Sequence, residues 1–567
     1  MSGSGRYMSN EQIYMVNSFQ FTRSARLILA HRPLGSGFCQ SESPERLPHQ
    51  APNFPYNWYM PRYAAIDIGS NSIRMAAAEV LPGSGMRVLA SERVVTRLGE
   101  SVFRHGILAQ EPLELTCMVL ARMAQQYQKL DVVGVRAVAT SAVRDARNQA
   151  EFIERASNAI GSPVEIVSGR EESRLIHLGV QARWPHPDRR LLIVDIGGGS
   201  AELIAGEHGA LRDSFSKPLG AVRLREIFLR NDPPLPDELH QMHEYIEEKL
   251  AGIGKRFGNT HWDRVIATSA TASAVVCAVN RIPRIKRDQA DRMRASAHEV
   301  RRLYKRLSVL DLAERRKAIG IGPKRAEIIV PGVSVLLRVL EDFRLPCLYY
   351  SAAGVRDGII ADLHARGVGR ELAQLGRDQR KEVEQMSRRY GVALPHARKV
   401  AGLAHTLFTD LQPLHQLPPH FGKLLEAAAY LHDAGHFVAD SNHHKHSYYL
   451  VNNSDMPGFT NREREIVANL CRYHRKSMPT PVHSNWQALN ADDKRVVLML
   501  IPLLRLADNL DVSHEERIQS LSCHIRDGQV VLQLCSAADI SLEQWAAARA
   551  GDAFRQVYNR SVVTERG

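Results

Sequence analysis

The sequence predicts an α/β protein of two related lobes, followed by an all-helical domain and a small C-terminal α+β piece. A strand–turn–strand segment with the pattern Asp-Ile-Gly-x-x-Ser occurs twice, beginning at Asp67 and at Asp195. Apolar strands alternate with amphipathic helical stretches between and after these copies. Strand signals fade beyond about residue 375. The length of 567 residues agrees with several domains, at about 150 residues per domain.

The composition is that of an ordinary globular protein, with 44% apolar and 24% charged residues. No run of 18 apolar residues suggests a membrane-spanning helix, and the N-terminus lacks the regions of a secretory signal. We therefore expect no stable membrane insertion and a cytoplasmic location. The seven cysteines include no CxxC pair, which argues against a disulfide framework or a thiolate zinc site.

Residues 1–60 show neither helical nor alternating periodicity. We expect a poorly ordered extension, or a misassigned start if Met60 is the natural first residue; a targeting peptide is a weaker third option.

The first lobe is expected over residues 61–185 and the second over 186–370. Each begins with a hairpin whose tip is polar and contains glycine. The predicted strands of the first lobe are Tyr63–Ile66, Ile73–Val80, Val133–Val138 and Val164–Val167, and those of the second include Leu191–Ile196 and Arg264–Ala267. Long amphipathic helices are predicted over Leu113–Gln128 and Glu238–Arg256.

The all-helical domain is expected over residues 376–515, with the small terminal piece over 516–567. Helical stretches rich in Ala, Leu, His and Arg cover Val383–Tyr390, His396–Leu411, Leu424–His432, Arg462–Tyr473 and Lys494–Leu510.

The two glycine-containing turns can direct backbone N–H groups and hydroxyls at one point, as a phosphate site requires. Gly197, Gly198 and Gly199 allow positive φ and close approach of a ligand to the backbone. Asp67 and Asp195, at strand ends, could hold Mg²⁺ through oxygen. Either turn alone could equally be an ordinary hairpin, but two matched copies favour phosphate binding.

A pair of glutamates, Glu171 and Glu172, begins a predicted helix after Ser168. A carboxylate near a metal-bound phosphate can orient and deprotonate an attacking water. Acidic residues in a first helical turn are also favoured by the helix dipole, and on the residues alone that structural explanation is preferred.

Five ordered motifs resemble one family, the exopolyphosphatase and guanosine pentaphosphate phosphohydrolase family. They are DIGSNSIRM from Asp67, ATSAVRDARNQAEF from Ala139, SGREESRL from Ser168, DIGGGSAEL from Asp195 and PLGAVRL from Pro218. The resemblance continues through RAEIIVPG from Arg325 and GVRDG from Gly354, covers about residues 62–365 and extends into the helical part.

The resemblance implies two actin-like (ribonuclease-H-like) lobes with an active-site cleft between them. It implies that Glu172 activates the attacking water, that Asp67 and Asp195 organise Mg²⁺ and water, and that Arg144 contacts phosphate. Arg144 could also be a plain surface charge. The implied phosphate-binding residues are Ser70, Asn71, Gly197, Gly198, Gly199 and Ser200.

The implied activity is Mg²⁺-dependent release of terminal orthophosphate from inorganic polyphosphate. The closest alternative is removal of the 5′ γ-phosphate of guanosine pentaphosphate in the stringent response, with a nucleoside pocket near Arg325. A non-catalytic polyphosphate-binding or nucleotide-sensing module stays open because Ala270 stands where relatives carry a glycine, and Ala270 disfavours positive φ.

The helical domain resembles HD-superfamily phosphohydrolases in the order His396, His432-Asp433 and Asp508, and relatives often carry a degraded ligand set. Imidazole and carboxylate suit a transition metal or Mg²⁺. The same residues could instead hydrogen-bond one another in a scaffold, and an independent HD phosphohydrolase activity remains a further alternative. His443, His444 and His446 could form a solvated turn that binds polyanions.

The formal net charge of +13 favours a polyanionic partner. Basic stretches at Arg281–Arg294, Arg301–Arg306 and Arg315–Lys317 are usually solvated helix faces, but they could also retain a long polyanion. Aromatic residues make up only 6%, which favours inorganic polyphosphate over nucleic acid. The resemblance further implies a homodimer.

Overall fold

The structure is a computed structural model that describes residues 60–567 except 82–84, 258–259, 368–372 and 527. The predicted N-terminal extension over residues 1–60 therefore lies outside the described residues, apart from Met60.

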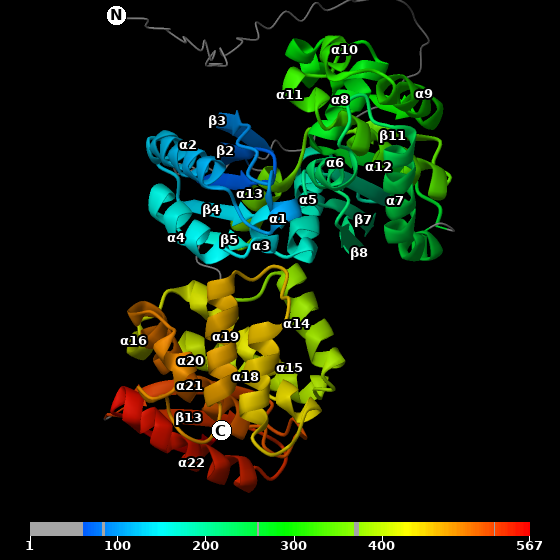
Figure 1. The fold of residues 1–567 in the computed structure, drawn as a ribbon. Coiled ribbons are helices and arrows are strands. Elements are labelled where there is room, and N and C mark those ends of the chain that lie inside the picture. Colours follow the sequence, from blue (N-terminus) through cyan, green and yellow to red (C-terminus); the bar gives the residue numbers. More distant parts are fainter. Residues whose placement is uncertain (1–59, 82–84, 258–259, 368–372, 527) are drawn as a thin grey trace, which may run out of the picture. The chain divides into compact units, whose positions relative to one another are not determined.

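The first lobe is built on a five-stranded sheet in the order β3-β2-β1-β4-β5 (Figure 1). Neighbouring β1, β2 and β3 are antiparallel, whereas β1, β4 and β5 are parallel. The elements are β1 (Arg62–Ile68), β2 (Ile73–Val80), β3 (Met86–Val94), α1 (Val102–His105), α2 (Gln110–Gln128), β4 (Gly134–Ala139), α3 (Ser141–Asp145), α4 (Gln149–Ile160), β5 (Val164–Ile166) and α5 (Gly169–Arg183).

The second lobe is built on a six-stranded sheet in the order β10-β11-β9-β6-β7-β8. Its elements are β6 (Arg190–Ile196), β7 (Ala201–Glu207), β8 (Ala210–Lys217), α6 (Ala221–Phe228), α7 (Pro236–Phe257), β9 (Arg264–Thr268), α8 (Ser269–Val279), the 3₁₀ helix η1 (Arg284–Ala290), β10 (Arg294–Ser296), α9 (Ala297–Ser308), α10 (Leu312–Lys317), α11 (Pro323–Ala326), α12 (Ile329–Asp342), β11 (Cys347–Tyr350) and α13 (Val355–Ala365).

The two sheets repeat one plan, which confirms two actin-like lobes. The sequence β3-β2-β1-β4-β5 of the first sheet has its counterpart in β8-β7-β6-β9-β11 of the second, with the same parallel and antiparallel pairings. The repeated hairpins also have the same register, since Asp67 pairs with Arg74 and Asp195 pairs with Glu202.

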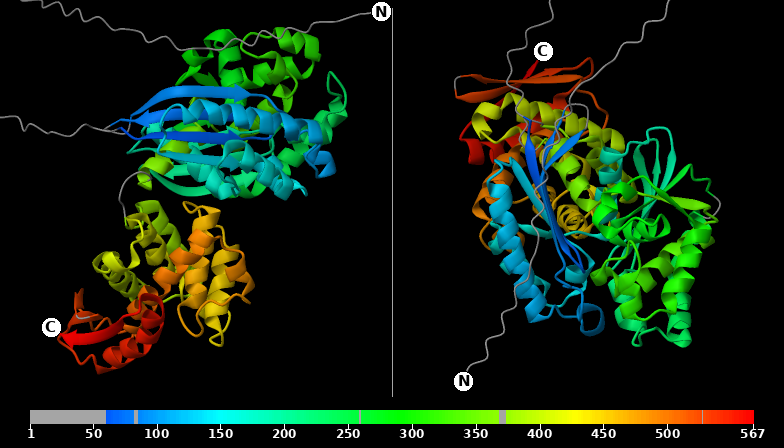
Figure 2. Two further views of the ribbon diagram at one scale, coloured as in Figure 1. Left: turned by 90° about the vertical axis from the view of Figure 1, so that its left-hand side faces the viewer. Right: turned by 90° about the horizontal axis from the view of Figure 1, so that it is seen from above.

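Each sheet carries an apolar core on its faces. In the first lobe, Leu113 and Leu120 of α2 and Phe152 of α4 are buried with side chains of β1 and β2. Figure 2 shows the blue strands of this sheet beside the paler helix α2. In the second lobe, α7, α8, α9 and α12 contribute to one large buried cluster.

Helix α13 follows the last strand of the second sheet but packs against β1 and β2 of the first. It therefore belongs by its packing to the first lobe, although the sequence places it near the end of the second. Glycines allow α13 to approach α5 closely, because a methyl group on Gly358 would lie 1.8 Å from Leu175 O. This packing fixes the helix that carries Glu171 and Glu172.

A helical region follows, with the elements α14 (Arg377–Arg389), α15 (Leu394–Asp410), α16 (Gln412–His415), η2 (Pro419–Phe421), α17 (Gly422–Leu431), η3 (Ala434–Phe437), α18 (His443–Asn453), α19 (Asn461–Tyr473), α20 (Ser484–Gln487) and α21 (Ala491–Asn509). The predicted terminal α+β piece consists of β12 (Ser520–Arg526), β13 (Gln529–Cys535), α22 (Ser541–Tyr558) and β14 (Ser561–Arg566).

The terminal piece shares its core with the helical region. Its sheet has the order β12-β13-β14, and Leu532, Leu534 and Phe554 are buried in the same cluster as Leu407 of α15 and Leu500 of α21. Among the described residues, no helix is both long and apolar enough to cross a membrane.

Candidate active site

The tips of the two repeated hairpins pack directly against each other. A methyl group on Gly198 would lie 2.9 Å from Ser70 Cβ, and one on Gly199 would lie 2.1 Å from Ser141 Oγ. Close approach is therefore what requires glycine here. The freedom of Gly197, Gly198 and Gly199 to adopt positive φ is not used, since none of the three has a positive φ.

The hydroxyls predicted to bind phosphate lie at this junction of the two tips. Ser70 and Ser200 are buried, and Ser70 Oγ lies 3.1 Å from Ser141 Oγ at the start of α3, within hydrogen-bond distance. Asn71 follows Ser70 in the first turn and is partly exposed. The two predicted phosphate turns are thus brought together by the fold.

Glu172 lies in the first turn of α5, where Ser168 caps the helix by accepting a hydrogen bond from Glu171 N. Its side chain is almost fully buried, and Oε2 has no hydrogen-bond partner among the described residues. Burial raises the pKa of Glu172 well above its usual value, and repulsion from Glu202, Asp67 and Asp195 adds to this effect. The carboxylate is therefore poised to hold a proton or a cation.

Arg144 is the nearest cation to Glu172, with 3.7 Å between Nη1 and Oε2. The same Nη1 donates a hydrogen bond to Val167 O at 2.6 Å, which fixes the guanidinium at the end of α3. The Arg144 side chain remains partly exposed, so its other nitrogen atoms can reach a ligand.

Asp67 and Asp195 end the central strands of the two sheets. Burial raises the pKa of both carboxyls, and the charge of Asp67 raises the pKa of Asp195 further. Thr268 Oγ1 donates a hydrogen bond to Asp195 Oδ2 and holds that side chain in place.

Glu202 is a site residue that the sequence analysis did not single out. It is buried on β7 opposite Asp195, and Ser216 Oγ donates a hydrogen bond to its Oε1 at 2.8 Å. Burial, with the charge of Asp195, raises the pKa of Glu202 to about 7. Alignment of the two hairpin copies would have found it, because Glu202 takes the position that Arg74 takes in the first copy.

The four carboxylates form a cluster of hard oxygen donors in which one oxygen, Glu172 Oε2, is buried without a hydrogen bond. Carboxylate oxygens are the ligands that Mg²⁺ prefers, and a bound divalent cation would offset the mutual repulsion. The residues present therefore fit the predicted magnesium ion.

Arginines from both lobes surround this acidic cluster. The sequence analysis named Arg325 for a nucleoside pocket, but it did not predict Arg74, Arg93 or Arg356 as site residues. Arg74 pairs with Arg93 across β2 and β3. The surrounding protein and the charge of Arg74 lower the pKa of Arg93, of Arg356 and of Arg325, the last to about 10. Cations that repel one another in this way favour an anionic ligand.

The turn at Thr268–Thr271 corrects the prediction made for Ala270. Positive φ occurs at Ser269, with a value of 75°, and not at Ala270, which lies in the first turn of α8. Ser269 Oγ donates a hydrogen bond to Ile196 O at 3.0 Å, which supports the unusual conformation. Ala270 therefore introduces no backbone strain at this site.

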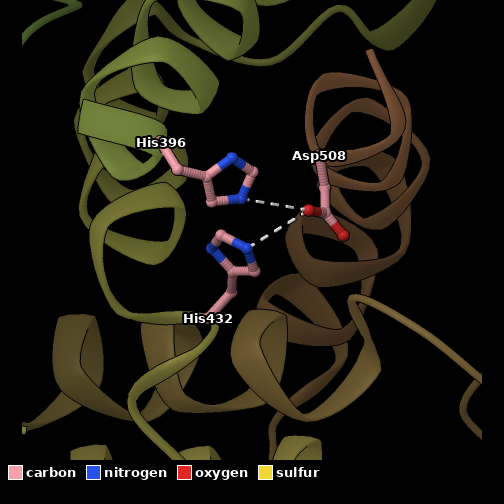
Figure 3. Close-up of side chains that lie close together, drawn as sticks. All are labelled: His396, His432 and Asp508. Carbon is pink, nitrogen blue, oxygen red and sulfur yellow. Dashed lines mark ion pairs between the residues drawn. The ribbon is translucent and has the colours of Figure 1, made fainter. Parts of the chain in front are cut away.

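The predicted ligands of the helical domain also lie together (Figure 3). His396 Nε2 and His432 Nε2 lie 3.5 and 3.3 Å from Asp508 Oδ1, and His432 Nε2 lies 3.5 Å from Asp433 Oδ2. The interpretation of His443 and His444 as a solvated turn is wrong, because both are buried on α18. His443 joins the cluster instead, together with His474 and His514, which were not predicted.

Comparison with known proteins identifies the family to which this two-lobed chain belongs. Residues 77–366 match the Ppx/GppA phosphatase family, and residues 379–546 match domain III of Ppx/GppA phosphatases. The chain therefore belongs to the Ppx/GppA phosphatase family.

Two similar solved structures agree with this membership. An exopolyphosphatase from Cytophaga hutchinsonii is 26% identical, with a TM-score of 0.50, and the match covers 53% of this chain and 97% of that one. A protein described as exopolyphosphatase-like is 28% identical, also with a TM-score of 0.50 and the same coverage. The Aquifex aeolicus family member is 28% identical over 53% of this chain and 97% of its own, with a TM-score of 0.47.

Proposed function

We propose that this protein is a Mg²⁺-dependent exopolyphosphatase that releases terminal orthophosphate from inorganic polyphosphate, with Glu172 as the general base. The observation that carries the proposal is the placement of Glu172 Oε2, which is buried without a hydrogen bond among three other acidic side chains. Membership of a phosphatase family and similarity to the Cytophaga hutchinsonii exopolyphosphatase support it.

In the proposed reaction, water attacks the terminal phosphorus while Glu172 accepts the proton of that water. The bridging P–O bond breaks, and its electron pair stays with the shortened polymer. A general base works best when its pKa lies near the operating pH, and the raised pKa of Glu172 moves it in that direction. Arg144, held by Val167 O, would neutralise charge on the phosphoryl oxygens.

Asp67 and Asp195, with Glu202 beside them, are the residues that would hold Mg²⁺. The ion would supply charge neutralisation for the phosphoryl group. The backbone at Gly197, Gly198 and Gly199 and the hydroxyls of Ser70 and Ser200 would grip the terminal phosphates; Asn71 belongs to the same proposed set.

The arginine cluster supports a long polyanion as the substrate. The cluster consists of four arginines on four different elements, Arg74 on β2, Arg93 on β3, Arg325 on α11 and Arg356 on α13. The charge of Arg74 lowers the pKa of the other three. One terminal phosphate does not require so many cations, whereas a chain of phosphates can contact them in succession.

Removal of the 5′ γ-phosphate of guanosine pentaphosphate is the second candidate. Tyr350, at the end of β11, is near enough to Arg74 and Arg287 for their charges to act on its hydroxyl, whose pKa is raised by burial. An aromatic ring beside arginines could stack on a guanine base. The same catalytic residues would serve both substrates.

The test is phosphate release by the full chain with Mg²⁺, with long-chain polyphosphate and guanosine pentaphosphate supplied separately and in competition. We expect faster release from polyphosphate and strong inhibition of nucleotide hydrolysis by the polymer. A higher kcat/KM for the nucleotide would replace the first candidate with the second. Tight binding of either without turnover would instead indicate a sensing module.

A homodimer and a cytoplasmic location complete the proposal. The homodimer rests on the family resemblance, and the cytoplasmic location is the expectation drawn from the sequence. Light scattering of the purified chain tests the first, and fractionation of the producing cells tests the second.

A further inference from the structure

The chain between α18 and α19 of the helical region contacts the first turn of α5. Its residues face two ways. Met456 and Phe459 are buried in the apolar core of the helical region. Asp455 and Gly458 instead form hydrogen bonds with the start of α5, the turn that carries Glu172. The connection therefore joins the core of the helical region to the proposed catalytic turn.

Ser168, the residue that caps α5, makes two hydrogen bonds through one hydroxyl group. Its Oγ donates to Asp455 Oδ1 at 2.8 Å and accepts from Glu171 N at 3.1 Å. A serine hydroxyl has a single proton, so donation to Asp455 leaves a lone pair of Oγ to accept from the helix N-terminus. Ser168 O also accepts a hydrogen bond from Glu172 N at 2.9 Å. Asp455 thus fixes the orientation of the capping residue that holds the backbone of Glu172.

Gly458 holds the same turn through its backbone N–H and carbonyl groups. Gly458 N donates a hydrogen bond to Glu171 Oε2 at 2.9 Å, and Gly458 O accepts one from Gln379 Nε2 of α14 at 2.8 Å. Both hydrogen bonds are buried, and Gly458 has a φ of 90°, a conformation that favours glycine. Glu171, the residue before Glu172, is therefore connected to α14 of the helical region.

Arg170, the second residue of α5, adds ion pairs to this turn. Its Nη2 lies 3.3 Å from Glu382 Oε2 of α14, and its Nη1 lies 3.9 Å from Asp455 Oδ2. The Arg170 side chain is 42% exposed, so solvent weakens both ion pairs. The hydrogen bonds of Ser168 and Glu171 are therefore the stronger restraints on the turn.

Glu172 follows these restrained residues directly, but its own Oε2 is buried without a hydrogen bond among the described residues. That oxygen is therefore positioned by the backbone of α5 and by packing. A displacement of about 1 Å in a reacting group can lower a rate by as much as about 10²-fold. The restraints on the first turn of α5 thus bear directly on the rate at which Glu172 can act.

We propose, on the basis of Glu172 as the proposed base, that Asp455 and Gly458 are positioning residues through which the helical region holds the catalytic turn of α5. Neither residue needs to touch the substrate, so the loss of Asp455 should lower kcat and leave KM nearly unchanged. The alternative is that these contacts only attach the helical region to the lobes. In that case the loss of Asp455 would lower stability without changing kcat of the folded protein.

Steady-state hydrolysis of long-chain polyphosphate by the full chain with Mg²⁺ tests the proposal. Asp455→Ala removes the acceptor for Ser168 Oγ, and we expect kcat to fall about tenfold with KM within about twofold of the wild type. The Asp455 side chain is 36% exposed, so its truncation leaves the apolar core intact. Asp455→Asn keeps an oxygen that accepts the same hydrogen bond and should restore most of kcat.

Asp552→Ala is the matched control, because Asp552 is an exposed aspartate of α22. It should leave kcat unchanged. A wild-type kcat in Asp455→Ala, or an equal loss of kcat in Asp455→Asn, would overturn the proposal.

The Glu172→Gln background separates the role of Asp455 from the role of the base. If Asp455 acts through Glu172, Asp455→Ala should lower the residual kcat of Glu172→Gln by less than about twofold, and a further fall of about tenfold would refute that route. Near-normal kcat in Glu172→Gln would refute Glu172 as the base, and the positioning role with it. An impaired Glu172→Gln beside a normal Asp455→Ala would refute the positioning role alone.

Hydrogen–deuterium exchange supplies a measurement that does not depend on activity. Peptides that cover residues 168–175 should exchange faster in Asp455→Ala than in the wild type, because Ser168 Oγ no longer holds Glu171 N in one orientation. Asp455→Asn and Asp552→Ala should exchange like the wild type. Unchanged exchange in Asp455→Ala would overturn the proposal whatever the activity of that variant.

Discussion

Glu171 and Glu172 are neighbours at the start of α5, yet their carboxylates lie in opposite electrostatic environments. Glu171 accepts hydrogen bonds from Arg174 Nε at 2.8 Å and from Gly458 N at 2.9 Å. Although burial opposes it, Arg174 and Arg136 hold the pKa of Glu171 below its usual value, whereas burial raises that of Glu172. One glutamate is therefore a structural ion-pair partner, and the other is available for chemistry.

Glu171→Gln should destabilise the protein, because it leaves Arg136 and Arg174 buried with one carboxylate fewer. We expect the free energy of unfolding to fall by about 3 kcal/mol, as for other broken buried ion pairs. Glu172→Gln should change it by less than about 1 kcal/mol, since it removes a charge that its neighbours repel. Urea unfolding at neutral pH measures both. Equal losses of unfolding free energy in the two variants would contradict the different environments assigned to Glu171 and Glu172.

The ion-pair network around Asp362 and Glu463 should make the folded protein less stable as the pH becomes acidic. Although burial opposes it, Arg366 and Lys423 lower the pKa of Glu463 to about 2, and arginines likewise lower that of Asp362. A carboxyl whose pKa is lower in the folded than in the unfolded protein stabilises the fold when the pH lies above its ordinary pKa, which is 4.5 for Glu463. That stabilisation is lost as the pH falls toward the pKa of the folded protein. Unfolding free energy should therefore drop between pH 4.5 and about 2.

Glu463→Gln tests the origin of this dependence, because its side chain no longer titrates. The slope of unfolding free energy against pH should become shallower over the same interval. An unchanged slope would mean that other carboxyls cause the acid sensitivity.

Gly199→Ala should impair activity by pushing the two hairpin tips apart. The added methyl group would lie 2.1 Å from Ser141 Oγ and 2.6 Å from Phe103 Cζ. We expect kcat/KM for polyphosphate to fall at least tenfold and stability to fall by about 1–3 kcal/mol. Gly402→Ala on α15 is the control, because nothing lies within 4 Å of the added atom there. Near-normal activity of Gly199→Ala would show that the tips tolerate the added methyl group.

Arg93→Gln should weaken binding of long polyphosphate more than binding of short polyphosphate. Arg93 lies on β3 opposite Arg74 of β2, so the two arginines are neighbouring cations. We expect KM for the long polymer to rise about tenfold and its salt dependence to become less steep, as fewer counterions are released. Arg549→Gln on α22, an exposed arginine of the terminal piece, should leave both unchanged. Equal effects of Arg93→Gln on KM for long and short polymers would contradict the proposal that successive phosphates of a long chain contact these arginines.

The two-lobed fold was predictable because the pattern Asp-Ile-Gly-x-x-Ser occurs twice. Each copy marks the end of one strand, a turn and the start of the next strand. The strand that follows each repeated hairpin, β3 in the first sheet and β8 in the second, was not predicted. Both lie at a sheet edge and are only partly buried, so their apolar alternation is weak. The return of α13 to the first sheet depends on contacts between distant segments, which a local pattern does not contain.

That Asp67, Asp195 and Glu172 lie close together was predictable from the family motifs, whereas the residues alone favoured a structural role for Glu172. Glu202 was missed because a glutamate inside a strand resembles an exposed surface residue; its burial follows from packing against Ser216 and Asp195. The arginines that surround the site come from separate strands and helices, so no spacing rule connects them. His474 was missed for the same reason, since α19 brings it to His443 across 31 residues.

The most direct test of the account is phosphate release from long-chain polyphosphate with saturating Mg²⁺, comparing Glu172→Gln with Glu154→Gln. Glu154 is an exposed glutamate of α4, so its substitution makes the same chemical change away from the site. The account predicts that kcat falls about 10²- to 10⁴-fold for Glu172→Gln, with polyphosphate binding retained, and stays unchanged for Glu154→Gln. Near-normal turnover by a folded Glu172→Gln variant would contradict Glu172 as the base.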